Sequence, residues 1–222
     1  MIAALVPAKA LARAKGRLSA ALSEEERRRL SLAMLGDVLA ALASVPEIEV
    51  RAVVSPDTDV LQAASVQGAL AIAEPPETRD LNGALTFAAA QLQAQGAGTL
   101  LVVPMDVPSI TERELRDLLE ALPKPTGVAI VRSAGRGTSA LAVSPPDVIP
   151  FSFGPRSASA HQQQAVRARV PSRLLRLPSI AIDIDSPQDL VDLLSRPDQT
   201  ETQRLLWDLG IAERLRAPLR RA

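Results

Sequence analysis

The chain has 222 residues, 25 lysines and arginines against 25 aspartates and glutamates, no cysteine and one histidine. This length is enough for one continuous core, and a content of 47% hydrophobic and 23% charged residues is that of an ordinary globular protein. A net charge of zero, with three Phe, one Trp and no Tyr, argues against a nucleic-acid partner, which needs phosphate neutralisation or base stacking. Without cysteine, the chain has no disulfide, no thiolate nucleophile and no sulfur-bound structural zinc.

The N-terminal residues and the lone histidine narrow the function classes further. The segment MIAALVPAK lacks the basic region and cleavage site of a secretory signal, and no run of about 18 apolar residues occurs. We therefore expect a cytoplasmic protein with no membrane partner. His161 lies among small polar residues, so we expect it on a helix surface. The composition favours an enzyme that works by positioning and metal electrostatics over one that uses covalent catalysis.

Short aliphatic runs alternate with segments of helical period along the chain. The runs expected as strands are 2–6, 48–54, 69–73, 99–103, 127–131, 141–144 and 180–184. Several of them are continuously apolar, which is typical of strands buried on both faces of a parallel sheet. The expected helices, most of them opened by a Ser, Thr or Asp cap, are 23–44, 57–67, 81–95, 111–122 and 186–194.

The order of these elements predicts an α/β fold. We expect a single Rossmann-like domain with a mostly parallel twisted sheet and helices on both faces. Between residues 126 and 178 the alternation loosens, so an antiparallel excursion is expected there. The domain should span 1–197, followed by a helical tail over 198–222 that packs on the same domain or on a partner.

Three cations lie in the segment that follows the first expected strand. They are Lys9, Lys15 and Arg17. Ligands of open parallel sheets bind at the carboxyl ends of the strands, and each of these side chains can donate to phosphate oxygens. The segment therefore indicates a triphosphate site, although a basic loop that only faces solvent has the same pattern. Neither a Walker pattern nor G-x-G-x-x-G is present.

Carboxylates follow two of the expected strands. Asp106 comes just after the apolar run 99–103, while Asp183 and Asp185 lie at the end of the run 180–184. Period-two alternation puts Asp183 and Asp185 on the same face of the expected strand. Two carboxylates so close together usually need a cation between them, unless both are exposed to solvent. We therefore expect Mg²⁺ to be bound by Asp106 and Asp185 together with substrate phosphates and water, with Asp183 as the alternative second ligand.

Two glycine-containing segments complete the set of candidate sites. In SAGRGTSAL, glycines flank Arg136 just before Thr138, and they permit either close approach to a ligand or a hairpin turn. In FSFGPRSASAH, Gly154 precedes Ser157, which we expect to cap a helix whose free amides could bind an anion.

With these segments in place, the chain resembles the 2-phospho-L-lactate / phosphoenolpyruvate guanylyltransferases of deazaflavin coenzyme biosynthesis, within the MobA-like nucleotidyltransferases. The resemblance spans about residues 2–195 and is carried by VPAKALARAKGRLS, LSEEERRRLSLAMLGDVLAAL, LNGAL, VPMDVPSI, GRGTSAL, FGPRSASAH and DIDSPQDL. The N-terminal block and FGPRS carry most of its specificity, whereas VPMD and DIDSPQDL alone indicate only a nucleotidyltransferase.

The resemblance implies transfer of GMP from GTP to the phosphate of a small phospho-acid, with release of pyrophosphate and Mg²⁺ as cofactor. Phosphoenolpyruvate, 2-phospho-L-lactate and 3-phospho-D-glycerate all remain possible acceptors, and the product would pass to a downstream transferase. A homo-oligomer remains an open possibility. The fold implied is that of the nucleotide-diphospho-sugar transferases.

The resemblance also implies a role for each candidate residue. The GTP phosphates would be bound by Lys9, Lys15 and Arg17, with residues 3–7 near the guanine and Asn82 near the nucleoside. The catalytic residues would be Lys15, Arg17 and Asp106, and the metal ligands Asp106 and Asp185. The phosphorylated acid would be bound by Thr138, Gly154 and Ser157.

Several positions depart from the family pattern. Arg132, Arg136 and Ser139 lie in the loop that usually reads D-R-x-G-T-G-T-N, and Asp80 and Arg156 stand where glycine is common. Most of these positions are on the acceptor side, so they bear on the identity of the acceptor. Two other interpretations follow: a MobA-like nucleotidyltransferase with another acceptor or base, or a catalytically silent nucleotide-binding regulatory module.

Overall fold

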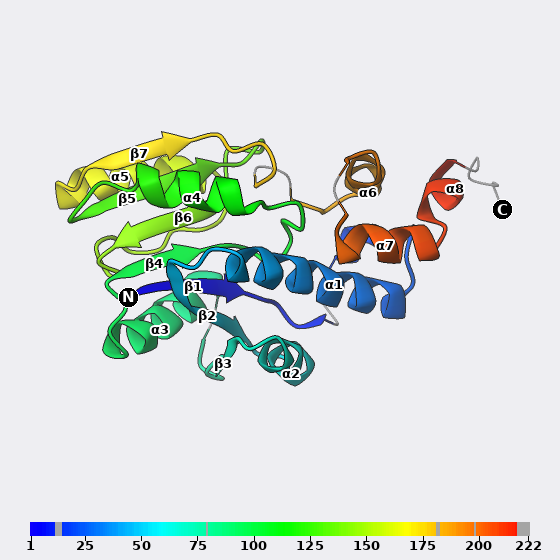
Figure 1. Ribbon diagram of the computed structural model, residues 1–222, viewed down its shortest axis with the longest axis horizontal. Helices are drawn as coiled ribbons and strands as arrows, with labels where there is room; N and C mark the ends of the chain where they lie inside the picture. The colour runs from blue at the N-terminus through cyan, green and yellow to red at the C-terminus, as the bar shows by residue number, and fades with distance from the viewer. Residues whose placement is uncertain (12–14, 79, 181–182, 198, 217–222) are drawn as a thin grey trace.

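A seven-stranded sheet forms the centre of the protein, as seen in a computed structural model that describes all residues except 12–14, 79, 181–182, 198 and 217–222 (Figure 1). Its order is β3-β2-β1-β4-β6-β5-β7. The strands are β1 (Ile2–Pro7), β2 (Ile48–Ser55), β3 (Leu70–Ala73), β4 (Thr99–Val102), β5 (Gly127–Arg132), β6 (Thr138–Ser144) and β7 (Ser172–Leu175). All neighbours pair in parallel except β6, which is antiparallel to β4 and β5.

Helices cover both faces of this sheet. They are α1 (Glu24–Ala43), α2 (Thr58–Val66), α3 (Leu81–Ala94), α4 (Glu112–Ala121), α5 (Ser157–Ala168), α6 (Pro187–Leu194), α7 (Glu201–Asp208) and α8 (Ile211–Arg216), with a 3-10 turn, η2 (Gly16–Leu18). Helices α1, α2 and α4 pack on one face, and α3 and α5 on the other. This confirms the predicted α/β class and the mostly parallel sheet, and β6 is the predicted antiparallel excursion.

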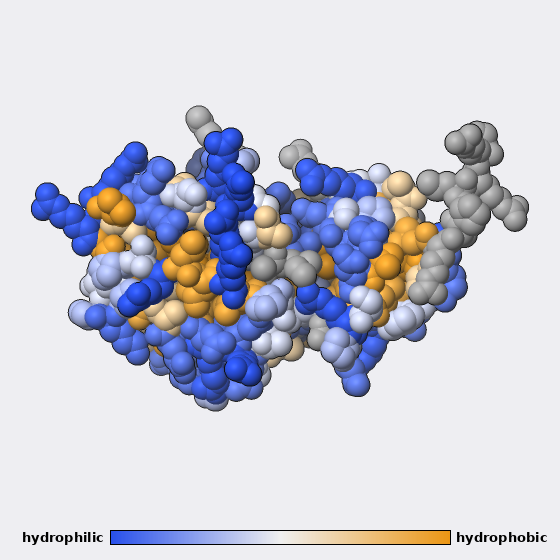
Figure 2. All heavy atoms as spheres, turned by 90° about the horizontal axis from the view of Figure 1, so that it is seen from above, coloured by the Kyte–Doolittle hydropathy of each residue, from blue (hydrophilic) through white to orange (hydrophobic). Residues whose placement is uncertain are grey.

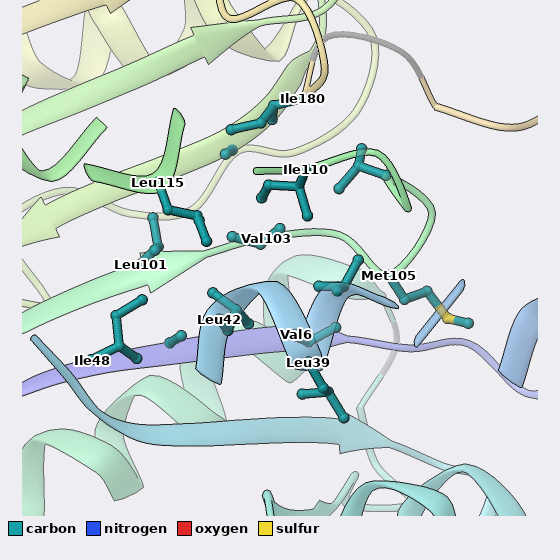
Figure 3. Close-up of a cluster of buried hydrophobic side chains, with 14 of the residues drawn as sticks. Val6, Leu39, Leu42, Ile48, Leu101, Val103, Met105, Ile110, Leu115 and Ile180 are labelled. Atoms are coloured by element: carbon teal, nitrogen blue, oxygen red, sulfur yellow. The ribbon is translucent and has the colours of Figure 1, made fainter. Parts of the chain in front are cut away.

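The core has one layer on each side of the sheet, because successive strand residues point to opposite faces. In β1, Ala4 and Val6 join the layer under α1, while Ala3 and Leu5 join the layer under α3. Figure 3 shows the first layer, in which Leu39 and Leu42 of α1 lie beside Val6 and Leu101. Strands β1 and β4, which are covered on both faces, are therefore buried and apolar over almost their whole length.

One strand prediction, 180–184, is wrong, and one strand was missed. Ile180 lies in a turn and residues 183–184 belong to no described strand, while 181–182 lie outside the described residues. Ile180 and Ile184 are apolar because they pack into two separate core clusters, not because they belong to the sheet. The edge strand β7 was missed because its burial pattern is only intermediate or exposed, so it carries no apolar run.

The C-terminal helices pack on α1 beyond the end of the sheet (Figure 1). A third core cluster joins these helices, and its members include Leu30, Met34, Leu190, Leu206 and Ile211. Asp37 of α1 accepts hydrogen bonds from the backbone N–H groups of Glu201 (2.7 Å) and Thr202 (2.9 Å). A carboxylate of α1 therefore satisfies the free amides at the start of α7.

None of the described helices combines the length and the apolar character needed to cross a bilayer. The face seen in Figure 2 is mostly hydrophilic, with hydrophobic side chains in separate patches over the sheet and over the C-terminal helices.

Candidate active site

A cavity of about 700 Å³ lies at the carboxyl ends of β1, β2, β3 and β4. The strand order reverses at β1, and ligands of open α/β sheets bind at such a reversal. The cavity is lined by Pro7, Ala8, Lys9, Ala10, Lys15, Ser31, Val54, Pro56, Glu74, Asp80, Leu81, Ala84, Pro104, Met105, Asp106, Phe153 and Asp185. Its volume lies within the range of small-molecule sites.

Lys15 joins the two predicted metal carboxylates within this cavity. Its Nζ atom lies 2.8 Å from Asp106 Oδ2 and 3.1 Å from Asp185 Oδ1, and its side chain is only 7% exposed. Burial alone would lower the pKa of Lys15, but the two carboxylates outweigh that effect, so its pKa is raised and the ammonium stays charged.

Backbone contacts hold the two aspartate segments side by side. The Ile184 N–H donates to the carbonyl of Asp106 at 3.1 Å. The Asp185 N–H donates to Asp189 Oδ2 at 2.9 Å, and Asp189 belongs to the capping box with which Ser186 opens α6. The start of α6 therefore positions Asp185, next to the Ser-Pro cap that the sequence predicted, and the described residues just before it form no strand.

Lys15 is positioned by an unusual backbone conformation. Its φ of 53° is left-handed, which is uncommon for a residue other than glycine. It precedes η2, whose Leu18 is fully buried in the cluster under α6 and α8. Such strain is found where the surrounding packing holds a functional side chain in place.

The carboxylate pair fits a divalent cation. A single ammonium group contacts both Asp106 and Asp185, so one cation between them can be bound by both. Within the described residues no cluster of three or more possible protein ligands is found, so the remaining ligands of an oxygen-seeking ion such as Mg²⁺ would be phosphates and water. Asp183 is exposed and does not line the cavity.

The other predicted phosphate and base contacts are only partly brought together. Lys9 is exposed and lines the cavity, whereas Arg17 is exposed on η2 and is not among the lining residues. Residues 3–6 are fully buried in β1, and only Pro7 of the segment expected near the guanine reaches the cavity.

Asn82, predicted near the nucleoside, binds the backbone of Phe153 with both polar atoms of its side chain. Its Nδ2 donates to the carbonyl of Phe153 at 3.1 Å, and its Oδ1 accepts from the Phe153 N–H at 2.7 Å. Both polar atoms therefore bind the backbone that precedes Gly154. Phe153 itself lines the cavity, so Asn82 acts on the cavity wall through Phe153.

The three residues predicted to bind the acid lie close together next to Phe153. The Ser157 N–H donates to the carbonyl of Gly154 at 3.1 Å. A Cβ atom built on Gly137, the neighbour of Thr138, would lie 3.7 Å from Ser157 Oγ and 4.0 Å from the Gly154 carbonyl oxygen. Gly154 has a φ of 136°, which only glycine adopts readily.

The prediction that Ser157 caps α5 is wrong. Arg156 is the N-cap, and Ser157 is the first helical residue, with 1% exposure. Arg156 has a φ of 57°. This left-handed conformation explains why glycine suits this position in the family that the sequence resembles.

His161 is not on the surface, so that prediction is also wrong. It is 0% exposed, its Nε2 accepts from the Ser152 N–H at 3.0 Å, and its Nδ1 lies 3.0 Å from Thr138 Oγ1. Burial lowers its pKa to about 4, so the ring is neutral at neutral pH. Its spacing of three and four residues from the buried Ala158 and Ala165 was the available signal, which the polar neighbours obscured.

Glu74 was missed in the sequence. It follows β3 as Asp106 follows β4, and its half-buried carboxylate lines the cavity. Burial raises the pKa of Glu74 above its ordinary value. The signal that singled out Asp106, an acid after a short aliphatic strand, would also have found it.

Comparisons with known proteins show which family the chain is similar to. The family described as "Guanylyl transferase CofC like" matches residues 2–220. The chain is 41% identical to the phosphoenolpyruvate guanylyltransferase of Sphaerobacter thermophilus over 191 residues, covering 86% of this chain and 91% of that protein. It is 35% identical to the protein of the same name from Nocardia farcinica over 221 residues, covering 98% and 96%.

Solved structures with low sequence identity share the fold. A protein from Desulfovibrio desulfuricans G20, classed as a nucleotide-diphospho-sugar transferase, superposes with a TM-score of 0.76 at 18% identity, covering 96% of this chain and 97% of that one. A nucleotidyl transferase from Methanothermobacter gives a TM-score of 0.63 at 18% identity, covering 87% and 95%.

Proposed function

Because the chain belongs to the CofC-like guanylyltransferase family, we propose that it transfers GMP from GTP to the phosphate of phosphoenolpyruvate and releases pyrophosphate. The observation that carries this proposal is the convergence of Lys15, Asp106 and Asp185 in a cavity of about 700 Å³. The names of the relatives favour phosphoenolpyruvate as the acceptor. The product would serve deazaflavin coenzyme biosynthesis, where a downstream transferase would consume it.

The chemistry needs no base from the protein. An oxygen of the acceptor phosphate forms a bond to the α-phosphorus of GTP, and the bond from that phosphorus to the bridging oxygen of the β-phosphate breaks. The electron pair of the broken bond stays on the departing pyrophosphate. The acceptor oxygen is already ionised at neutral pH, so catalysis depends on alignment and charge stabilisation. This agrees with a chain whose one histidine is buried and neutral.

Asp106 and Asp185 would hold Mg²⁺. A bound Mg²⁺ supplies positive charge that neutralises the reacting phosphate oxygens. The Lys15 ammonium, which lies between the same carboxylates, would move onto the GTP phosphates, with Lys9 at the cavity edge as a second phosphate contact. Arg17 lies outside the cavity lining, so we assign the pyrophosphate contact first to Lys15.

Glu74 would select guanine. Its carboxylate lines the same cavity as the apolar side chains of Pro7, Val54 and Leu81, which can cover the faces of a base. Guanine presents an N1–H and a 2-amino group side by side, and a carboxylate accepts hydrogen bonds from both. Adenine offers no such pair of donors, so this residue favours GTP over ATP.

The test is pyrophosphate release from each of the four nucleoside triphosphates with phosphoenolpyruvate, 2-phospho-L-lactate or 3-phospho-D-glycerate. Release with GTP and phosphoenolpyruvate is the expected result, and Asp106→Asn should reduce it by on the order of 10²-fold or more. Release with another acid would reassign the acceptor. Tight GTP binding without release with any acid would favour a silent binding module.

A further inference from the structure

We propose that His161 is a positioning residue that fixes the Thr138 hydroxyl as a hydrogen-bond donor toward the phosphorylated acid. The identity of the acid rests on the proposed function, but the direction of the hydrogen bonds does not. Neither His161 nor Thr138 is among the residues that line the cavity; both lie beside its lining residue Phe153. His161 would therefore act on the acid through Thr138 and through the backbone at Ser152.

The hydrogen-bond partners determine which ring nitrogen carries the proton. A backbone N–H can only donate, so Nε2 of His161, 3.0 Å from the Ser152 nitrogen, must be the acceptor and carry no proton. A neutral imidazole has one N–H, which therefore lies on Nδ1. That group is 3.0 Å from Thr138 Oγ1, so His161 donates and Thr138 accepts.

This arrangement directs the proton of Thr138 away from the ring. With Oγ1 accepting from His161, its own hydrogen must donate to another group. Thr138 is 8% exposed and follows Gly137, which is packed near Ser157 Oγ and the Gly154 carbonyl. A hydroxyl held as a donor at this place suits an anionic oxygen, such as a carboxylate or phosphate oxygen of the acid.

The same ring also holds the segment before Gly154. Its edge packs against Phe153 with ring centroids 5.0 Å apart and an interplanar angle of 71°. The backbone of Phe153 is bound from the other side by Asn82. Loss of the imidazole would therefore disturb the acid-binding residues Thr138 and Gly154 while leaving Lys15 and the carboxylate pair in place.

The tautomer can be measured directly, because the chain has only one histidine. Nitrogen-15 labelling of histidine followed by NMR gives the signals of a single imidazole. At neutral pH we expect the neutral form with the proton on Nδ1, in slow exchange with solvent. A proton on Nε2, or a rapidly averaging mixture of both tautomers, would overturn the inference. This measurement needs no substrate, so it decides the inference even if phosphoenolpyruvate is not the acceptor.

Kinetics test the consequence for the acid. His161→Leu removes the donor to Thr138 and should raise KM for phosphoenolpyruvate about tenfold, the usual effect of one lost hydrogen bond, with KM for GTP within about twofold. His161→Asn can still donate from its amide and should recover most of the loss. The exposed Gln163 lies on the same helix, and Gln163→Leu is the matched control, expected to leave both constants unchanged.

A double variant separates positioning from general destabilisation. Thr138→Val should raise KM for phosphoenolpyruvate by about as much as His161→Leu, since each removes the same directed donor. If His161 acts through Thr138, adding His161→Leu to Thr138→Val should raise this KM little further. Fully additive effects, or an equal rise in KM for GTP, would contradict the proposal. If His161→Leu does not fold, the tautomer seen by NMR still tests the proposal. So does the KM for phosphoenolpyruvate of Thr138→Val, which should be raised, against that of His161→Asn, which should stay near the wild-type value.

Discussion

Lys15 is the only described cation that bridges the two site carboxylates, so its removal tests the arrangement of the site most directly. Lys15→Met keeps a side chain of similar length and removes the charge, which leaves Asp106 and Asp185 facing each other. Breaking a buried ion pair costs about 3–5 kcal/mol, whereas an exposed pair is worth about 0–1 kcal/mol. Here the lysine is 7% exposed but the carboxylates are 26% and 46% exposed. We therefore expect a loss of about 2 kcal/mol.

The assay is denaturant unfolding of wild type and Lys15→Met, with and without Mg²⁺. In metal-free buffer the variant should unfold at lower denaturant, and Mg²⁺ should restore much of the difference, because a cation bound only by the folded state stabilises it. Lys9→Met is the matched control, since Lys9 is exposed, and its effect should stay within about 0.5 kcal/mol. Equal stability of Lys15→Met and wild type without metal, or equal stabilisation of both by Mg²⁺, would refute the reasoning.

Three further predictions concern other parts of the site. Ser157→Ala should raise KM for phosphoenolpyruvate about tenfold with little change in KM for GTP, and steady-state kinetics that show equal effects on both substrates would reject Ser157 as an acceptor contact. Glu74→Gln should lower kcat/KM for GTP about tenfold and kcat/KM for ITP less, because ITP lacks the 2-amino donor. An unchanged ratio of kcat/KM for GTP to kcat/KM for ITP counts against Glu74. His161 has a pKa lowered from 6.5 to about 4 in the folded protein, so the unfolded chain binds more protons between these values and stability falls as the pH falls through that window. This shift makes the free energy of unfolding of wild type fall by about 3 kcal/mol over that window, and His161→Asn should lack this fall. Denaturant unfolding at several pH values measures it, and the same pH slope in both proteins would contradict the buried neutral ring.

Many elements of the fold follow from short-range patterns in the sequence. Short aliphatic runs predicted the first six strands, and several of these runs are continuous because both faces of the strand are covered. The serines before α1 and α6 predicted where those helices begin, because a cap satisfies free amides within three residues of itself. Asp106 and Asp185 were found in the same way, as acids beside strand and helix ends.

The tertiary structure alone decided which of these residues meet. Lys15 lies 91 residues before Asp106 and 170 before Asp185 in the sequence, and nothing in the N-terminal basic segment distinguished it from Arg17, which lies outside the cavity lining. His161 has the polar neighbours of a surface helix and is nevertheless fully buried. Asn82 has both polar atoms bound to the Phe153 backbone, 71 residues away. Caps and periodicity act within a few residues and can be recognised locally, whereas burial and ion pairing depend on segments that meet only when the sheet and its helices pack.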